Sequence, residues 1–77
     1  MHIPSLRQLQ YLAAVAQYGN FSSAAEACHV TQSTLSAGIG ALESLLNHML
    51  VDRSQNQVTL TPFGSEVALR AHGMLAA

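Results

Sequence analysis

The sequence contains no lysine and no tryptophan, only one cysteine and two prolines, and just 9% of its 77 residues are charged. Three arginines against four acidic residues give a formal net charge of −1, so the broad basic surface that usually marks a DNA-binding protein is missing. No apolar run approaches the roughly 20 residues needed to cross a bilayer, and no secretory signal opens the chain. We therefore expect a cytoplasmic protein that does not contact a membrane.

The patterns of the common catalytic and metal sites are also missing. The single Cys28 cannot form an intrachain disulfide, and its isolation favours apolar filler over a redox sensor. The four histidines lie far apart along the chain, without the spacing that a zinc site needs: His2, His29, His48 and His72. No glycine-rich phosphate loop occurs, and no acid and histidine accompany the serines to activate a nucleophile. We expect no cofactor, no metal and no enzymatic activity.

Helical periodicity dominates the first half of the chain. A first helix is predicted to begin at the N-cap Ser5 and to end at the breaker pair Gly19-Asn20. Its expected apolar face consists of Leu6, Leu9, Leu12, Ala13 and Ala16. A second, short helix is predicted to begin at Ser22 or Ser23, because either serine can act as the N-cap and residues 23–26 match a reciprocal capping box.

The remaining elements are a third helix, a hairpin and a last helix. Thr31 is placed to cap the third helix, which should end near Asn47. The expected buried stripe of that helix is Leu35, Ile39, Leu42 and Leu46. Short β-prone runs on either side of residues 54–57 predict a small hairpin, and Thr61-Pro62 predicts the start of the last helix.

The second and third helices, joined by a turn of about three residues, form a helix-turn-helix, whose second helix can lie in a DNA major groove. That helix begins with short polar side chains suited to base edges or phosphates: Gln32, Ser33, Thr34 and Ser36. Gly38 and Gly40 are weak helix formers, so either the backbone approaches DNA closely there or a solvent face tolerates them. Arg53 either contacts DNA or forms a structural ion pair with Glu43 or Asp52.

Residues along essentially the whole chain resemble the LysR-type transcriptional regulators. The residues that carry this resemblance are Leu9-Gln10-Tyr11-Leu12, Gly19-Asn20-Phe21-Ser22, Ala24-Ala25, Val30-Thr31-Gln32-Ser33-Thr34-Leu35-Ser36, Ile39, Leu42-Glu43, Leu46, Leu50, Arg53 and Leu60-Thr61-Pro62-Phe63-Gly64. Within the family, the run Cys28-His29-Val30-Thr31-Gln32 is most similar to the peroxide-sensing, OxyR-like branch.

The resemblance implies a mainly α winged helix-turn-helix: a three-helix core and hairpin wing over residues 1–61, and the start of a linker and dimerisation helix over residues 62–77. It implies a longer protein whose small-molecule effector domain lies outside this chain, and a homodimer that binds an inverted-repeat operator in double-stranded DNA. Dimer contacts are then expected from Phe63, Val67, Ala71, Met74 and Leu75. Major-groove positions match Gln32, Ser33, Ser36 and Ala37, the minor-groove wing position matches Asn56, and phosphate-contacting positions match Ser22 and Ser23.

The sequence departs from the family at cationic positions. Arginine is frequent in the family where this chain has Ala37 and Asn56, and arginine or lysine is frequent where it has Gly40. We therefore expect a weak DNA binder with a shallow salt dependence, which uses short polar side chains, helix N-termini and the pairing of two half-sites. The alternative is a winged-helix dimerisation or protein-interaction module that has lost DNA affinity.

Overall fold

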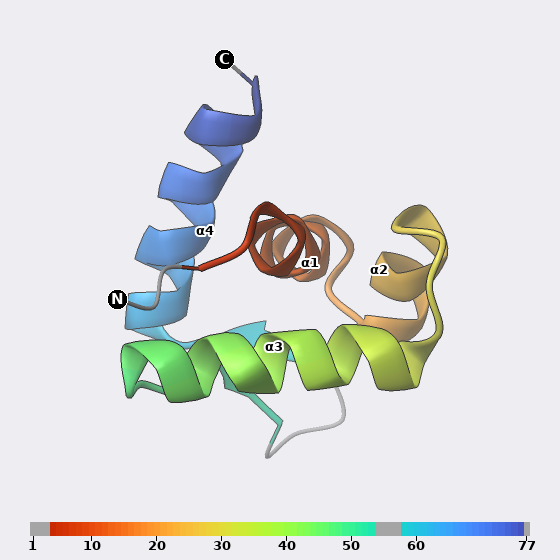
Figure 1. Ribbon diagram of the computed structural model, residues 1–77, viewed down its shortest axis with the longest axis horizontal. Helices are drawn as coiled ribbons and strands as arrows, with labels where there is room; N and C mark the ends of the chain where they lie inside the picture. The colour runs from red at the N-terminus through yellow and green to blue at the C-terminus, as the bar shows by residue number, and fades with distance from the viewer. Residues whose placement is uncertain (1–3, 54–57, 77) are drawn as a thin grey trace.

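The computed structural model describes residues 4–53 and 58–76, and the side chains of the last helix as far as residue 73. The elements are α1 Leu6–Tyr18, α2 Phe21–Ala27, α3 Gln32–Leu46, β1 Val51–Asp52, β2 Thr59–Leu60 and α4 Pro62–Ala76 (Figure 1). This is the predicted order of helices and hairpin. Within the described ranges, no helix is long and apolar enough to span a membrane.

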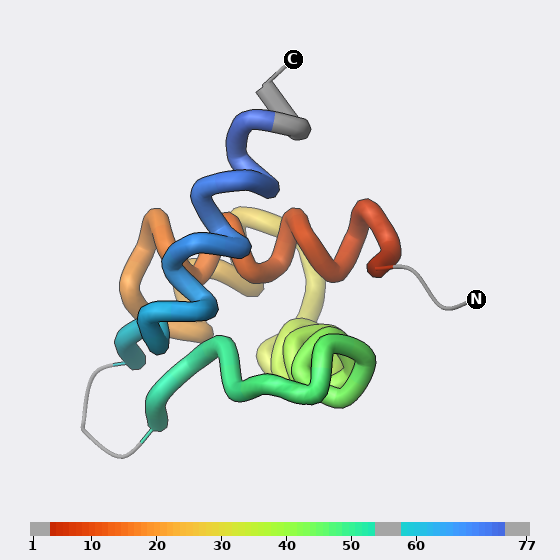
Figure 2. Tube along the Cα trace, turned by 90° about the vertical axis from the view of Figure 1, so that its left-hand side faces the viewer, coloured from red at the N-terminus to blue at the C-terminus, as the bar shows by residue number. Residues whose placement is uncertain are grey.

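The first helix is the centre of the domain. It packs against α2, α3 and α4. Figure 1 looks along α1 while α3 runs across the view, and Figure 2 shows the reverse, so the two helices cross. The strands are antiparallel, with Val51 opposite Leu60 and Asp52 opposite Thr59. From the hairpin, α4 passes along α1 and continues away from α3, which leaves one side of it open.

Most helix ends follow local signals in the sequence. Ser5 Oγ accepts the N–H of Gln8 at 3.1 Å while the Gln8 side chain accepts the N–H of Ser5 at 2.9 Å, which completes a capping box. Thr31 caps α3 in the same way through its hydroxyl. Gly19 and Asn47 have φ of 74° and 56°, so both helices that they follow end in the predicted left-handed conformation.

The predicted cap of α2 is wrong. Asn20 is the N-cap, and its Oδ1 accepts the N–H of Ser23 at 2.7 Å. Ser22 and Ser23 therefore lie inside the first turn, and the capping box expected over residues 23–26 does not open the helix. The cause is the position of Gly19: because it ends α1 directly, the next residue already caps α2, and no spacer separates the helices.

The core lies where all four helices meet the hairpin. Its largest fully buried side chains are Leu12, Val15, Leu35, Ile39, Leu42, Leu50 and Val51. On α1 the buried face differs from the prediction, because Tyr11 and Val15 face inward while Leu6 is 59% exposed and Ala16 is exposed. Packing on three sides gives α1 a wider inner face than a single amphipathic stripe indicates.

Tyr11 explains one of the two weak helix formers in α3. A Cβ added at Gly38 would lie 2.5 Å from Cδ2 of Tyr11, whose side chain is only 4% exposed. The glycine therefore allows α3 to cross α1 closely, and close approach to DNA is not the reason for it. At Gly40 an added Cβ would meet open space, so simple tolerance explains that glycine.

The two glycines form a matched pair for a stability test. We expect Gly38→Ala to lower the free energy of unfolding by about 1–3 kcal/mol, because the buried Tyr11 ring must move. Gly40→Ala should raise the free energy of unfolding by up to about 1 kcal/mol, because alanine is the better helix former. Urea unfolding followed by circular dichroism measures both, and equal effects at the two positions would contradict this account.

Candidate functional site

The turn between α2 and α3 sets the direction of α3. Cys28 ends α2, and His29 adopts the left-handed conformation with φ of 59°. The N–H of Val30 then donates to the carbonyl oxygen of Ala25 at 3.0 Å, which ties the turn to α2. The predicted helix-turn-helix is thus present, with Thr31 opening α3 on the exposed side of the domain.

An open groove of about 600 Å³ lies beside the first turns of α3. Its lining residues come from α2, α3 and the hairpin region: Phe21, Gln32, Ser33, Ser36, Ala37, Arg53 and Val58. Five of these are residues that the sequence analysis nominated for DNA contact, and the fold brings them together. Phe21 was not nominated, because an aromatic residue at a helix start usually indicates packing.

The other nominated DNA contacts lie outside this groove lining. Ser22 is exposed and Ser23 half-buried, both in the first turn of α2. Thr34 belongs to the α3 cap: its N–H donates to Thr31 Oγ1 at 3.1 Å, and its hydroxyl oxygen accepts from the Thr31 hydroxyl at 3.0 Å. Asn56 falls outside the described residues. DNA contact by these four residues stays a prediction.

Arg53 enters the groove from the residue after β1. Its Nη1 donates to Ser36 Oγ at 3.4 Å, and its Cζ lies 4.8 Å from the centre of the Phe21 ring. A cation at this distance from an aromatic ring is attracted by the ring's negative face. The guanidinium is therefore held between an aromatic ring and a hydroxyl group.

Glu43 has a different structural role from the ion pair considered for it. Its Oε2 accepts the backbone N–H of Leu50 at 2.8 Å and that of Val51 at 3.3 Å. Both acceptor contacts are part-buried, and both fix the chain as it leaves α3 for β1. The Glu43 carboxylate therefore positions the hairpin relative to α3, and with it Arg53.

Removing this carboxylate should loosen the hairpin. We expect Glu43→Ala to lower the free energy of unfolding by about 1–3 kcal/mol, because the buried Leu50 N–H loses a charged acceptor. Thermal unfolding measures the change, with Glu26→Ala on the exposed face of α2 as the matched control. A loss no larger than that of the control would show that the two amides do not depend on Glu43.

The start of α4 is joined to the same region. Thr61 Oγ1 accepts the N–H of Gly64 at 2.9 Å and donates to the carbonyl oxygen of Met49 at 2.7 Å, while Pro62 is the first helical residue. A Cβ at Gly64 would collide with the carbonyl oxygen of Leu50, so only glycine permits this close approach. The predicted cap and proline are confirmed.

The residues nominated for dimerisation occupy different environments. Phe63 stacks on His48 with ring centres 4.4 Å apart, and Val67 is half-buried against the core. Ala71 is only 1% exposed, so its nomination as a surface contact is wrong: it lies on the inward face of α4. Leu69, which was not nominated, is 74% exposed. The side chains of Met74 and Leu75 lie outside the described residues.

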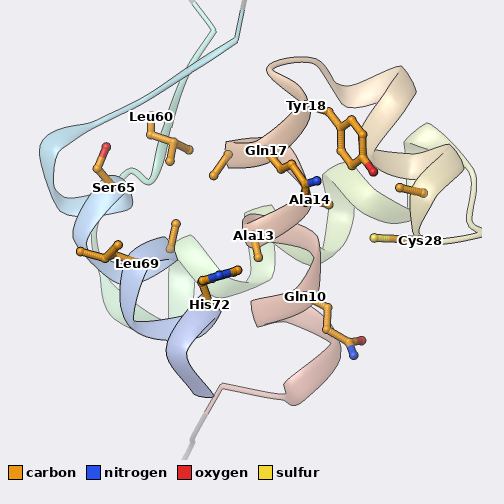
Figure 3. A pocket seen from close by; sticks show the side chains of 13 residues that line it. Gln10, Ala13, Ala14, Gln17, Tyr18, Cys28, Leu60, Ser65, Leu69 and His72 are labelled. Atoms are coloured by element: carbon orange, nitrogen blue, oxygen red, sulfur yellow. The ribbon is translucent and has the colours of Figure 1, made fainter. Parts of the chain in front are cut away.

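A second groove, of about 660 Å³, runs between α1 and the outer side of α4 (Figure 3). Leu69 and His72 line it from α4, and Ala13 and Gln17 line it from α1. Cys28 lies at its far end beside Tyr18. Burial raises the pKa of the Cys28 thiol, which favours its unreactive protonated form and agrees with a packing role.

Residues 6–65 match the family model described as bacterial regulatory helix-turn-helix protein, lysR family. The chain belongs to the lysR family. The HTH-type transcriptional regulator EstR of Acinetobacter baylyi is 50% identical over 74 residues, which are 96% of this chain and 25% of EstR. This chain thus spans about a quarter of the length of that curated relative.

Solved structures of lysR-family proteins share the fold. Full-length OxyR from Pseudomonas aeruginosa matches with a TM-score of 0.90 and 40% identity, over 97% of this chain and 25% of that one. The BenM DNA-binding domain in complex with benA site 1 DNA matches with a TM-score of 0.89 and 33% identity, over 94% of this chain and 81% of that one. The relatives are transcription regulators, and OxyR-like proteins are among them.

Proposed function

We propose that this chain binds double-stranded DNA, with the first turns of α3 in the major groove, as part of a dimeric LysR-type regulator that acts in the cytoplasm and is not an enzyme. The observation that carries the proposal is the groove beside α3, which gathers Gln32, Ser33, Ser36, Ala37 and Arg53 on one open face. The BenM domain supports it, because the same fold is bound to DNA there.

Each groove residue suits a different part of DNA. The Gln32 amide can form two hydrogen bonds with an adenine edge, and the Ser33 and Ser36 hydroxyls can contact bases or phosphates. The Ala37 methyl group can pack against a thymine methyl. Arg53 can bind phosphate or enter the minor groove beside the hairpin. The backbone N–H groups that open α3 add neutral donors for phosphate.

Electrostatic attraction contributes little to this binding. Of the three arginines in the sequence, only Arg53 lines the groove, and Arg70 forms an exposed ion pair with Glu66 at 3.1 Å. Each neutralised phosphate contributes about 0.9 to the slope of log affinity against log salt. A dimer that relies on two copies of Arg53 should therefore have a slope near −2, which is shallow for a DNA-binding protein.

Fluorescence anisotropy with duplexes enriched from a random-sequence pool tests the DNA proposal. We expect Gln32→Ala to weaken binding to the enriched duplex about 10-fold to 100-fold, the cost of about 1–3 kcal/mol for one lost bidentate base contact. Its binding to an arbitrary duplex should change little. The matched control is Ser44→Ala, an exposed position in the later turns of the same helix.

The same experiment separates the alternative, a winged-helix interaction module with little DNA affinity. The net charge of −1 and the exposed apolar groove favour that alternative. If the wild-type chain binds no duplex and the double variant Ala37→Arg, Asn56→Arg gains strong binding, the module is the better description. A modest gain over measurable wild-type binding favours a weak native DNA binder.

The dimer contact is proposed on the outer face of α4, where Ser65, Leu69 and His72 lie on one side of the helix at four- and three-residue spacings. Leu69 leaves most of its side chain in water in the single chain. A second copy seated along this face would bury Leu69 in the groove beside α1. Phe63 and Val67 then support the interface from the inward side of α4.

Leu69→Glu should therefore weaken self-association. Burial of a leucine side chain stabilises by about 1.5–3 kcal/mol, so we expect the dimer dissociation constant to rise at least about 10-fold. Sedimentation equilibrium measures the constant. Met49→Glu is the matched control, because Met49 is 61% exposed and lies away from this groove, in the loop after α3. Equal effects of the two variants would place the dimer contact elsewhere.

A further inference from the structure

We propose that Phe21 is a positioning residue for DNA recognition: its ring orders Arg53 across the groove beside α3 before DNA arrives. The inference rests on the proposed DNA-binding function. The three groups involved come from three elements, with Phe21 opening α2, Ser36 on α3 and Arg53 after β1. All three line the same groove.

The contact geometry supports a role in ordering rather than in charge neutralisation. Phe21 carries no charge, and its ring centre lies 4.8 Å from Cζ of Arg53, within the range of attraction between a cation and a ring face. The hydrogen bond from Nη1 to Ser36 Oγ is long, at 3.4 Å. The ring is therefore the stronger of the two restraints on the guanidinium.

A ring contact leaves the guanidinium able to bind a second partner. The N–H donors of arginine lie in the plane of the guanidinium, whereas an aromatic ring attracts its charge without accepting those hydrogen bonds. Of the five donors, the described contacts use one, on Ser36. The remaining donors can reach a phosphate or a base edge while the ring still holds the side chain.

Order before binding matters most for this chain. A free arginine loses rotamer freedom when it binds, and a side chain that is already ordered avoids part of that loss. Because the sequence has no lysine and Arg53 is the one arginine in the groove, no neighbouring cation can compensate for a misplaced guanidinium. Removal of the ring should thus weaken DNA binding although no charge is removed.

A double-mutant cycle with Phe21→Leu, Arg53→Ala and the combined variant tests this inference. Binding is measured by anisotropy with a duplex enriched by the wild-type chain. We expect Arg53→Ala to reduce affinity about 10-fold and to reduce the salt slope by about 1 for each arginine lost. We expect Phe21→Leu to reduce affinity about 3-fold to 10-fold with the slope retained, and to have almost no effect in the Arg53→Ala chain.

Two further variants separate positioning from folding. Phe21→Tyr keeps an aromatic ring and should retain wild-type affinity. Phe21→Met fills a similar volume without a ring, so it should behave as Phe21→Leu does and replaces that variant if leucine prevents folding. Thermal unfolding of every variant identifies losses of affinity that come from an unfolded fraction.

A measurement without DNA completes the test. In the free chain, the Arg53 side-chain protons next to the guanidinium should be shifted upfield by the Phe21 ring, and Phe21→Leu or Phe21→Met should abolish that shift. Additive effects in the cycle, or an Arg53 shift that does not depend on residue 21, overturn the inference while leaving DNA binding intact. Failure of the wild-type chain to bind any duplex overturns both this inference and the proposed function.

Discussion

The backbone of Leu50 joins the recognition helix, the hairpin and the last helix. Its N–H donates to the Glu43 carboxylate of α3 at 2.8 Å, and its carbonyl oxygen accepts the N–H of Thr61 at 3.0 Å. Its side chain is fully buried, and Gly64 leaves room for α4 to pass against it. Because one residue fixes both the hairpin and the start of α4, the groove beside α3 and the outer face of α4 are built on the same support.

Sequence signals that act within a few residues predicted the elements well. The hydroxyl groups of Ser5, Thr31 and Thr61 each cap a helix, and Asn47 ends α3 in the left-handed conformation. Such ends depend only on donors and acceptors within one turn, so a short stretch of sequence contains the needed information. The α2 cap was missed because asparagine and serine cap by the same chemistry and local preference does not rank them.

Features that depend on distant residues could not be predicted in this way. The need for glycine at position 38 comes from Tyr11, a residue on another helix. Periodicity on α4 indicated an apolar stripe but not which side of it would face the core, so Ala71 was placed outward and Leu69 was overlooked. In the groove, the polar residues that open α3 follow from the helix-turn-helix pattern, whereas Phe21 and Arg53 meet only after the hairpin folds back.

The scarcity of charge determines how such a domain can recognise DNA. With one arginine in the groove, affinity has to come from neutral donors, a close fit and the order of the few groups present, all of which depend on the exact path of the backbone. Weak binding by one domain also makes occupancy depend on a second domain held at the correct distance, because effective concentration then supplies much of the affinity. A change in the spacing of the two domains would therefore alter DNA occupancy strongly without altering a single contact in the groove.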